Sequence, residues 1–357
     1  MKVAVIGTQG VPASYGGFES LVENLLGDNC PEGVEYTVFC SSKDLSEYPK
    51  SYKGAALKYV PFSANGAQSV PYDVVSLCRA IRGYDAVLVL GVSGCLFLPV
   101  FRLFNRSRLI VNIDGLEHRR AKWGQFARRI LRSSEAMAVR MADVIIADNK
   151  GIQDYVTETY GKPSELIAYG GDHVRRELTA AFVDETLARY GLSRGGYAIS
   201  VCRIEPENNS HLILEAFAEA EMPLVFIGNW DHSEYSRELR DRYSGVGNIR
   251  ILDAIYDLDI LYALRSNAGI YVHGHSAGGT NPSLVEAMFF GMPIVAYDVV
   301  YNRETTEGRA YYFHTAEDIR RHLGARLDGA PMTEIAARRY TWRHIAAQYC
   351  RLYSRID

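Results

Sequence analysis

The sequence predicts an α/β protein built from two Rossmann-like domains in tandem. Short apolar runs alternate with stretches of helical periodicity along its 357 residues. Most of these runs are continuous, which is typical of strands buried on both faces of a parallel sheet. Strands that alternate with helices indicate βαβ units. The length suits two domains of roughly 100–200 residues each.

The expected strands form two sets, separated by a connection over about residues 171–195. The first set is 3–6, 36–40, 86–90, 109–112, 144–147 and 165–168, and the second is 197–201, 224–227, 249–252, 268–272 and 294–296. Two helices between strands are marked by apolar faces, namely Phe18, Leu21, Val22, Leu25 and Leu26, and Leu212, Ile213, Ala216 and Phe217. We therefore predict domains over 1–175 and 176–339. An amphipathic helix over 340–357 could pack on either domain, including back on the first.

Composition excludes several classes of protein. The formal net charge is −3, so no global positive field favours nucleic acid. The six cysteines show no CxxC pair and no metal-ligand spacing, and we expect buried, reduced thiols and no metal. No window reaches the ~20 apolar residues that span a bilayer, and the N-terminus reads as a strand, not a signal peptide. These features predict a cytoplasmic protein, either soluble or peripheral to a membrane.

Two such domains are expected to face each other across a cleft, with ligands near the carboxyl ends of the strands. The first loop there, 7–19, is glycine-rich, includes Gly16 and Gly17, and opens a helix. Glycines allow close approach of the backbone to a ligand, and a helix N-terminus attracts anions. The spacing matches neither GxGxxG nor the phosphate loop ending in GK[ST]. A mobile surface turn is the alternative.

The loop 273–288 follows a strand of the second domain and is the strongest single feature. Thr280 or Asn281 can cap the next helix, with a proline at its start. The backbone amides of Gly278, Gly279 and Thr280 are expected to bind a diphosphate. Glu286 lies about one turn into the helix, where it can reach a sugar hydroxyl. Alternatively, it complements the helix dipole.

Two further loops carry charged groups. Arg203, after the first strand of the second domain, can fork onto phosphate oxygens and stabilise a departing diphosphate. A surface ion pair with Glu205 is the alternative. In the first domain, Asp114 follows a strand and can position an acceptor hydroxyl or accept its proton, unless it only caps the following helix. Glu117 and His118 are further candidates on the acceptor side.

Basic residues gather in the next segment. Seven of them lie between Arg119 and Arg140, against one acid, Glu135. The candidates for contact with an anionic membrane are Arg119, Arg120, Lys122, Trp123, Arg128 and Arg129. The apolar stretch 95–104 lies upstream, and a basic surface beside an apolar segment suits an anionic membrane. A solvated helix face and a buried core helix are the alternative. No nucleic-acid-binding motif accompanies the charge.

Taken together, the segments VIGTQGVPASYGGFE, NIDGLE, RIEPENN and GGTNPSLVEAM resemble the retaining GT-B glycosyltransferases of family four. The resemblance covers nearly the whole chain. Within that family, the segments look most like the bacterial subgroup that includes rhamnosyltransferases of cell-wall and capsule polysaccharide assembly. The resemblance implies that the donor lies mainly on the second domain. Arg203 would then hold the diphosphate, and Glu286 would bind the nucleotide ribose. The remaining donor-binding positions that it implies are Gly16, Gly17, Glu205, Ile255, Tyr256, Gly278, Gly279, Thr280 and Asn281.

Two departures from the family pattern affect the donor. Gly278 stands where the first glutamate of the E-x7-E motif is usual, and Asn208-Asn209 replaces a frequent lysine. The subgroup resemblance implies dTDP-L-rhamnose as donor, a polyprenyl-diphosphate-linked sugar as acceptor, no cofactor, and a place at the inner face of the plasma membrane. A sugar-nucleotide epimerase and a non-catalytic sugar-nucleotide-binding scaffold are the rival functions.

Overall fold

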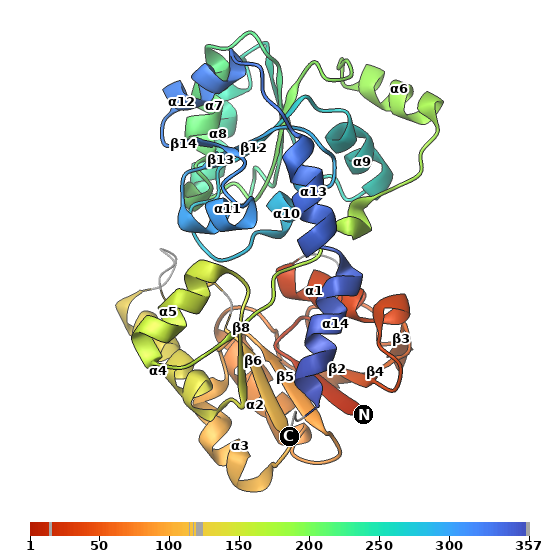
Figure 1. Cartoon of the computed structure of the whole chain (residues 1–357), viewed down its shortest axis with the longest axis vertical. Helices are drawn as coiled ribbons and strands as arrows, with labels where there is room; N and C mark the ends of the chain where they lie inside the picture. The colour runs from red at the N-terminus through yellow and green to blue at the C-terminus, as the bar shows by residue number, and fades with distance from the viewer. Residues whose placement is uncertain (14–15, 114, 117, 119–123, 355–357) are drawn as a thin grey trace. The chain divides into compact units, whose positions relative to one another are not determined.

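The computed structural model describes the whole chain except residues 14–15, 114, 117, 119–123 and 355–357. It divides into two compact units, Met1–Tyr169 with Trp342–Asp357, and Gly170–Thr341. Each unit is an α/β layer structure with helices on both faces of its sheet (Figure 1). The expected boundary at residue 175 therefore lies a few residues beyond the division in the structure.

Within the described residues, the sheet of the first unit runs in the order β3-β4-β2-β1-β5-β6-β7-β8. All of its pairings are parallel except β3 with β4. The strands are β1 (Lys2–Ile6), β2 (Glu35–Ser41), β3 (Ser51–Tyr52), β4 (Ala55–Val60), β5 (Ala86–Leu90), β6 (Arg108–Asn112), β7 (Val144–Ala147) and β8 (Glu165–Leu166). The helices are α1 (Gly17–Leu25), α2 (Ser69–Arg79), α3 (Leu98–Phe104), α4 (Gln125–Met141), α5 (Lys150–Tyr160) and α14 (Trp342–Tyr353).

The second unit contains a parallel sheet in the order β11-β10-β9-β12-β13-β14. Its strands are β9 (Ala198–Val201), β10 (Leu224–Ile227), β11 (Ile249–Leu252), β12 (Ile270–His273), β13 (Ile294–Tyr297) and β14 (Tyr311–Phe313). Its helices are α6 (Ala180–Arg189), α7 (Ser210–Ala218), α8 (Glu234–Tyr243), α9 (Leu258–Ser266), α10 (Pro282–Met288), α11 (Val300–Thr305), α12 (Ala316–Leu323) and α13 (Ala330–Arg339). The strand order turns back at β9 and β12, where ligands bind in open α/β sheets.

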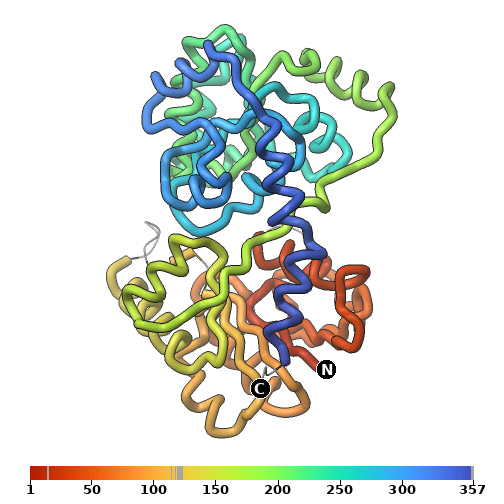
Figure 2. Tube along the Cα trace, in the orientation of Figure 1, coloured from red at the N-terminus to blue at the C-terminus, as the bar shows by residue number. Residues whose placement is uncertain are grey.

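The last helix, α14, belongs to the first unit although it ends the chain. The tube in Figure 2 follows this return. Its buried side chains include Trp342, Ile345, Tyr349 and Tyr353, which join the core formed by β1, β2 and α1. The amide of Asn112 donates to the Tyr349 hydroxyl at 3.1 Å. The helical spacing seen in the sequence is thus the face that α14 buries.

Three strands were not predicted. β4 and β14 lie toward sheet edges and β3 is a two-residue edge strand. β4 alternates between buried and exposed residues at its start instead of forming a continuous apolar run, because one of its faces meets solvent. The predicted strand 165–168 is shorter in the structure, ending at Leu166.

The prediction of buried, reduced cysteines is confirmed in part. All six are free thiols. Cys40 and Cys95 are buried, whereas Cys78 is exposed and the other three are half-buried. The expectation of uniform burial was wrong for Cys78, which lies on the solvent side of α2.

Candidate functional site

Two loops at the carboxyl ends of β9 and β12 are tied together within the second unit. The side-chain amide of Asn209 donates to Gly274 O at 2.9 Å. Ser276 donates twice to Glu207 O, from its backbone N at 2.9 Å and from Oγ at 2.7 Å. A Cβ on Gly274 would stand 2.0 Å from Asn208 O, so only glycine permits this approach. The sequence predicted both loops as donor-binding, and the structure brings them together.

Arg203 lies exposed at the start of the first of these loops. Among the described residues its guanidinium has no ion pair or hydrogen bond, and Glu205 in particular does not pair with it. Its backbone carbonyl is held by the Asn208 side chain at 2.6 Å. The alternative of a surface ion pair is therefore not what the structure contains, and the cation is available to an anionic ligand.

The second loop ends in the capped helix that the sequence predicted. Asn281 is the N-cap of α10, its side chain accepting from Ser283 N at 3.0 Å, and Pro282 occupies the first turn. Gly278 has φ +104°, a backbone conformation that favours glycine, and a Cβ there would have only His275 Nε2 near it, at 3.9 Å. Gly279 is half-buried and Thr280 is buried. Binding of a diphosphate by these amides stays a prediction.

Glu286 is held by a buried arginine that the sequence analysis missed. Arg265, only 3% exposed, donates from Nη1 to Glu286 Oε2 at 2.7 Å, and its Nη2 donates to Ser283 O at 3.3 Å. His173 Nε2 lies 3.5 Å from Glu286 Oε1. Burial lowers the pKa of His173, although the carboxylate opposes this. The available signal was Arg265 itself, a charged residue directly after the apolar pair Ala263-Leu264.

The segment between β11 and α9 carries two of the donor-binding residues that the resemblance implies. Ile255 is half-buried, whereas Tyr256 is 71% exposed. Asp257 caps α9 through hydrogen bonds from Asp259 N and Ile260 N. The tyrosine ring is therefore free to stack on a ligand, on a backbone fixed by the adjacent cap.

A buried histidine lies at the end of β12. His273 is 2% exposed and stacks between Tyr271 and His275 at centroid distances of 5.9 and 5.8 Å. Its Nε2 has no hydrogen-bond partner in the described part of the chain. Burial lowers the pKa of His273 to about 3, so the ring is neutral at physiological pH.

The glycine-rich loop of the first unit is shaped by acids from α1. Gly16 caps α1 with φ +130°, and a Cβ on it would stand 1.9 Å from Glu19 Oε2; Gly17 opens the helix. The Glu19 carboxylate accepts from Thr8 Oγ1 at 3.0 Å and Gln9 N at 2.8 Å. Burial raises the pKa of Glu19. The loop is thus positioned by its own helix.

Of the three predicted acceptor-side residues, Asp114 and Glu117 lie outside the described residues. His118 contacts a buried acid: its Nδ1 lies 3.0 Å from Glu135 Oε2. Glu135 is 1% exposed, although the sequence analysis noted it only as the one acid in a basic segment. Its helical spacing with the buried residues Ala138 and Val139 was the signal that it faces inward.

Of the predicted membrane-facing residues, Arg119, Arg120, Lys122 and Trp123 lie outside the described residues. Arg128 and Arg129 on α4 are exposed. Several large apolar side chains on α4, α3 and the turn before α3 are also exposed, namely Leu96, Val100, Leu103, Phe104 and Phe126. The alternative of a buried core helix over 95–104 holds for one face of α3 only. None of the described helices is long and apolar enough to cross a membrane.

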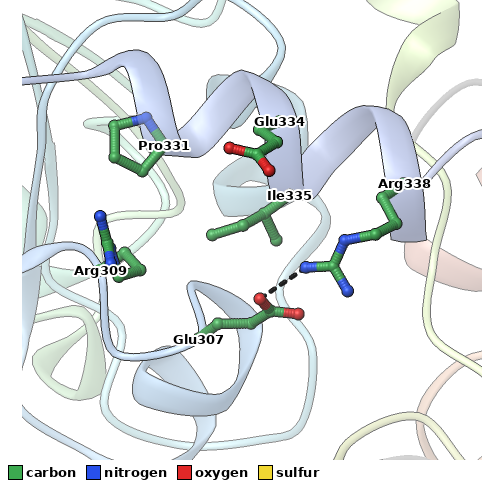
Figure 3. A pocket seen from close by; sticks show the side chains of 6 residues that line it. All are labelled: Glu307, Arg309, Pro331, Glu334, Ile335 and Arg338. Carbon is green, nitrogen blue, oxygen red and sulfur yellow. Dashed lines mark hydrogen bonds and ion pairs between the residues drawn. The ribbon is translucent and has the colours of Figure 1, made fainter.

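A cavity of about 340 Å³ lies elsewhere on the second unit. Figure 3 shows its lining, in which Arg338 and Glu307 form an ion pair at 2.6 Å. It includes none of the predicted donor-binding residues. We assign it no ligand.

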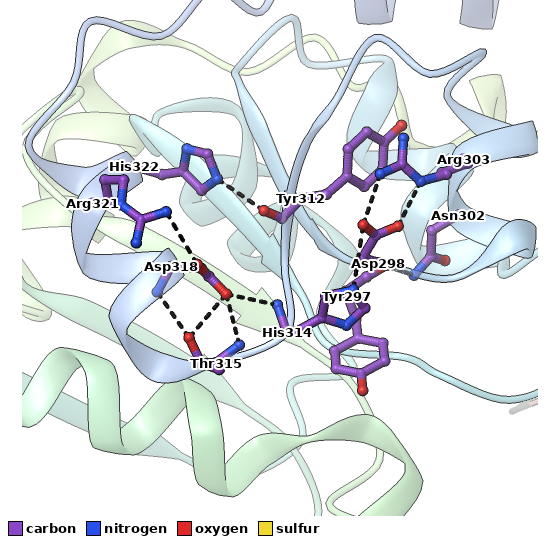
Figure 4. Close-up of polar contacts among 10 residues, drawn as sticks. All are labelled: Tyr297, Asp298, Asn302, Arg303, Tyr312, His314, Thr315, Asp318, Arg321 and His322. Carbon is purple, nitrogen blue, oxygen red and sulfur yellow. Dashed lines mark hydrogen bonds and ion pairs between the residues drawn. The ribbon is translucent and has the colours of Figure 1, made fainter.

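A polar cluster after β13 also supports the loop that follows β12. Asn302, 2% exposed, donates to Tyr297 O and His275 O, each at 2.8 Å. Beside it, Asp298 receives two hydrogen bonds from Arg303, at 2.5 and 2.7 Å (Figure 4). The Asn302 hydrogen bond holds the backbone of His275, which precedes the glycine pair of the donor loop.

Two family models and a curated relative match parts of the chain. Residues 187–316 match the family described as Glycosyl transferases group 1, and residues 1–172 match a domain of unknown function (DUF1972). Over 63% of its length, the chain is 26% identical to O-antigen chain mannosyltransferase B of Escherichia coli. The match covers 64% of that protein, so the chain spans less than two thirds of this relative.

The solved structures show the fold. Sucrose-phosphate synthase from Thermosynechococcus elongatus superposes with a TM-score of 0.79 at 17% identity, covering 99% of this chain and 98% of that one. Anabaena Alr3699/HepE in complex with UDP gives a TM-score of 0.76 at 14% identity, covering 98% and 99%. The chain therefore has the two-domain GT-B fold that the sequence predicted.

Proposed function

We propose that the protein is a glycosyltransferase that takes a sugar from a nucleoside diphosphate and binds this donor on its second unit. The observation that carries the proposal is the pair of joined loops after β9 and β12. They combine an exposed, unpaired Arg203 with a Glu286 that Arg265 holds in place. These loops lie within the residues that match the group 1 family.

The proposed chemistry is retaining transfer without a protein nucleophile. The bond between the anomeric carbon and the diphosphate breaks with its electron pair leaving on the diphosphate oxygen. The acceptor oxygen bonds to the anomeric carbon on the same face, and its proton moves to the departing diphosphate, assisted by Asp114. Arg203 and the loop amides stabilise the leaving group, and no metal is required. No carboxylate pair placed for a double displacement was evident from sequence.

There are two candidate donor substrates. The subgroup resemblance supports dTDP-L-rhamnose. The relative named as a mannosyltransferase supports a mannosyl nucleotide as the second candidate. The proposed acceptor is a polyprenyl-diphosphate-linked sugar in cell-surface polysaccharide synthesis.

A panel of sugar nucleotides distinguishes these donors. A ligand that binds only the folded protein raises its stability by RT ln(1 + [L]/Kd), about 2.7 kcal/mol at a hundredfold excess over Kd. We expect a selective rise in melting temperature and turnover with dTDP-L-rhamnose, compared with GDP-mannose and UDP-glucose. Preference for GDP-mannose would replace the rhamnosyl assignment. No response to any sugar nucleotide or nucleoside diphosphate would contradict the donor site and favour the scaffold.

An acceptor-free assay separates the transferase from the epimerase. An epimerase converts its sugar nucleotide without any acceptor, whereas the proposed enzyme needs an acceptor for turnover beyond slow hydrolysis. Chromatography of the sugar nucleotide after incubation alone is the measurement. Accumulation of an isomeric sugar nucleotide would establish the rival function.

We also propose that the apolar and basic surface of α3 and α4 binds the inner face of the plasma membrane. Exposed Leu103 and Phe126 can insert at the interface while Arg128 and Arg129 face anionic headgroups. Sedimentation should show binding to vesicles containing phosphatidylglycerol, weakened by salt, and little binding to phosphatidylcholine. A Leu103→Ser/Phe126→Ser variant should lose binding, and Arg326→Ala, an exposed change on the second unit, should keep it. Equal binding of all three proteins would contradict the proposal.

A further inference from the structure

A buried carboxylate in the first unit joins three side chains. Glu135 on α4 is 1% exposed. Its Oε1 accepts from the hydroxyls of Tyr155 at 2.8 Å and Tyr160 at 2.7 Å, both on α5. Its Oε2 lies 3.0 Å from His118 Nδ1. The two oxygens therefore have different partners, hydroxyls on one and an imidazole on the other.

These partners determine where the protons lie. A buried carboxylate is tolerated in its charged form when donors surround it. Burial and the Glu135 carboxylate raise the pKa of Tyr160, so its hydroxyl stays a donor throughout the physiological range. With two hydroxyls donating to Oε1, the ionised carboxylate has only acceptor capacity left for His118. The ring must therefore carry its proton on Nδ1.

The opposite edge of the His118 ring carries Nε2. Among the described residues of the first unit, this atom has no hydrogen-bond partner, and the side chain is 12% exposed. The ring also lies against Tyr155, with centroids 6.1 Å apart. In its neutral form with the proton on Nδ1, the imidazole presents a lone pair at Nε2, which accepts a hydrogen bond.

We propose that Glu135 is a positioning residue that fixes His118 in the Nδ1–H tautomer, so that Nε2 accepts a hydrogen bond from a hydroxyl of the acceptor sugar. This inference rests on the proposed function for the identity of the ligand. The tautomer itself does not depend on that function. Glu135 acts through His118 and does not touch the substrate.

The Glu135→Gln substitution tests this arrangement with little change of shape. The carbonyl oxygen of the new amide is expected to face the two tyrosine hydroxyls, which need an acceptor. Its NH₂ group then faces His118 Nδ1 and donates to it, which moves the ring proton to Nε2. Tyr160→Phe is the matched control, because it removes one hydrogen bond to Glu135 and leaves the acceptor for Nδ1–H in place.

Nitrogen NMR of protein labelled with ¹⁵N-histidine measures the tautomer directly. The His118 signals are identified by their loss in His118→Phe. We expect the Nδ1–H tautomer in the wild type and Tyr160→Phe, and the Nε2–H tautomer in Glu135→Gln. An Nε2–H tautomer in the wild type, or an unchanged tautomer in Glu135→Gln, would overturn the proposal. The wild-type spectrum shows which tautomer His118 adopts even if Glu135→Gln does not fold.

Kinetics with octyl α-D-mannoside and octyl β-D-glucoside as acceptor probes tests the role of Nε2. The donor is the sugar nucleotide selected by the panel. Glu135→Gln should raise the KM for the acceptor about tenfold, as expected for one lost hydrogen bond, and leave the KM for the donor unchanged. Tyr160→Phe should change neither by more than about threefold. An unchanged acceptor KM in Glu135→Gln rejects a requirement for Nε2 as a hydrogen-bond acceptor, because a sugar hydroxyl can also accept from Nε2–H. Absence of transfer by the wild type rejects the proposed function, whereas the NMR result still decides the tautomer.

Discussion

Charged residues differ in whether the protein supplies them with a partner of opposite charge. Arg203 is exposed and has no partner among the described residues, whereas Arg265 is 3% exposed and bonded to Glu286 at 2.7 Å. A cation left without a counter-ion at the end of a strand suits an anionic ligand. A buried cation with a carboxylate instead supports the structure. The sequence predicted a role for Arg203 and none for Arg265. Only the apolar neighbours Ala263 and Leu264 distinguish Arg265 in the sequence.

Replacing Arg203 should impair transfer without destabilising the fold. Arg203→Ala is expected to reduce turnover roughly 10²–10³-fold, because a donor aimed at the leaving diphosphate is lost. Steady-state kinetics and thermal unfolding are the two measurements. Arg326→Ala serves as control for loss of an exposed arginine on the same unit. Near-normal turnover in Arg203→Ala would remove the assigned role.

His273 should make the stability of the protein depend on pH. Its folded-state pKa, about 3, lies below the unfolded value of about 6.5. Between these values the unfolded chain binds a proton that the native protein does not, so stability falls as pH falls through this window. The slope from this residue is about 1.4 kcal/mol per pH unit.

Urea unfolding between pH 4 and pH 7 measures that slope. His273→Phe, which can retain the stack with Tyr271, should reduce it even if total stability is lower. His232→Phe, at an exposed histidine, should leave the slope as in the wild type. An identical slope in wild type and His273→Phe would show that this ring is protonated in the native protein.

At the scale of elements, the chain end completes the first unit. α14 buries Trp342, Ile345, Tyr349 and Tyr353 against the core of that unit. The hydroxyls of Tyr353 and Tyr36 meet at 3.1 Å. The sequence indicated the amphipathic face, but only long-range packing decides which sheet receives it.

Truncating a buried ring of α14 should destabilise the first unit. Tyr349→Ala is expected to cost about 3–5 kcal/mol, through lost packing and the cavity it leaves. Arg343→Ala, an exposed change on the same helix, should stay within about 0.5 kcal/mol of the wild type. Hydrogen exchange resolved along the chain would locate the effect. Faster exchange confined to the second unit would contradict this placement of α14.

The strands differ in how well the sequence pattern predicts them. Continuous apolar runs identified the central strands, such as β5 and β10, because both faces of those strands are buried. β4 is partly exposed on one face, and β14 is only three residues long with two half-buried tyrosines. Their weaker pattern resembles that of loops, so they were missed. Helix caps were more predictable, since the cap on α10 depends on the local sequence Asn281-Pro282.

On the scale of the whole molecule, each unit contains its own sheet and hydrophobic core. No group of three or more potential metal ligands was found among the described residues. The proposed chemistry places positive charge on Arg203 and backbone amides instead.

Transfer by the purified enzyme should be insensitive to EDTA. We expect turnover within about twofold of the untreated enzyme, because the leaving group is stabilised by protein groups. The measurement compares initial rates after dialysis against chelator, with and without added Mg²⁺ or Mn²⁺. Loss of activity that either ion restores would show that a metal takes part.

Local sequence patterns were enough to predict the fold class, the central strands, the loops at their carboxyl ends and the capped start of α10. These depend on burial periodicity and local hydrogen bonding, which neighbouring residues encode. Tertiary structure alone decided that Asn209 joins Gly274, that Arg265 holds Glu286, and that Glu135 faces His118. Each pair is separated by between 17 and 65 residues in the chain. Such contacts form only when distant elements pack, so no local pattern specifies them.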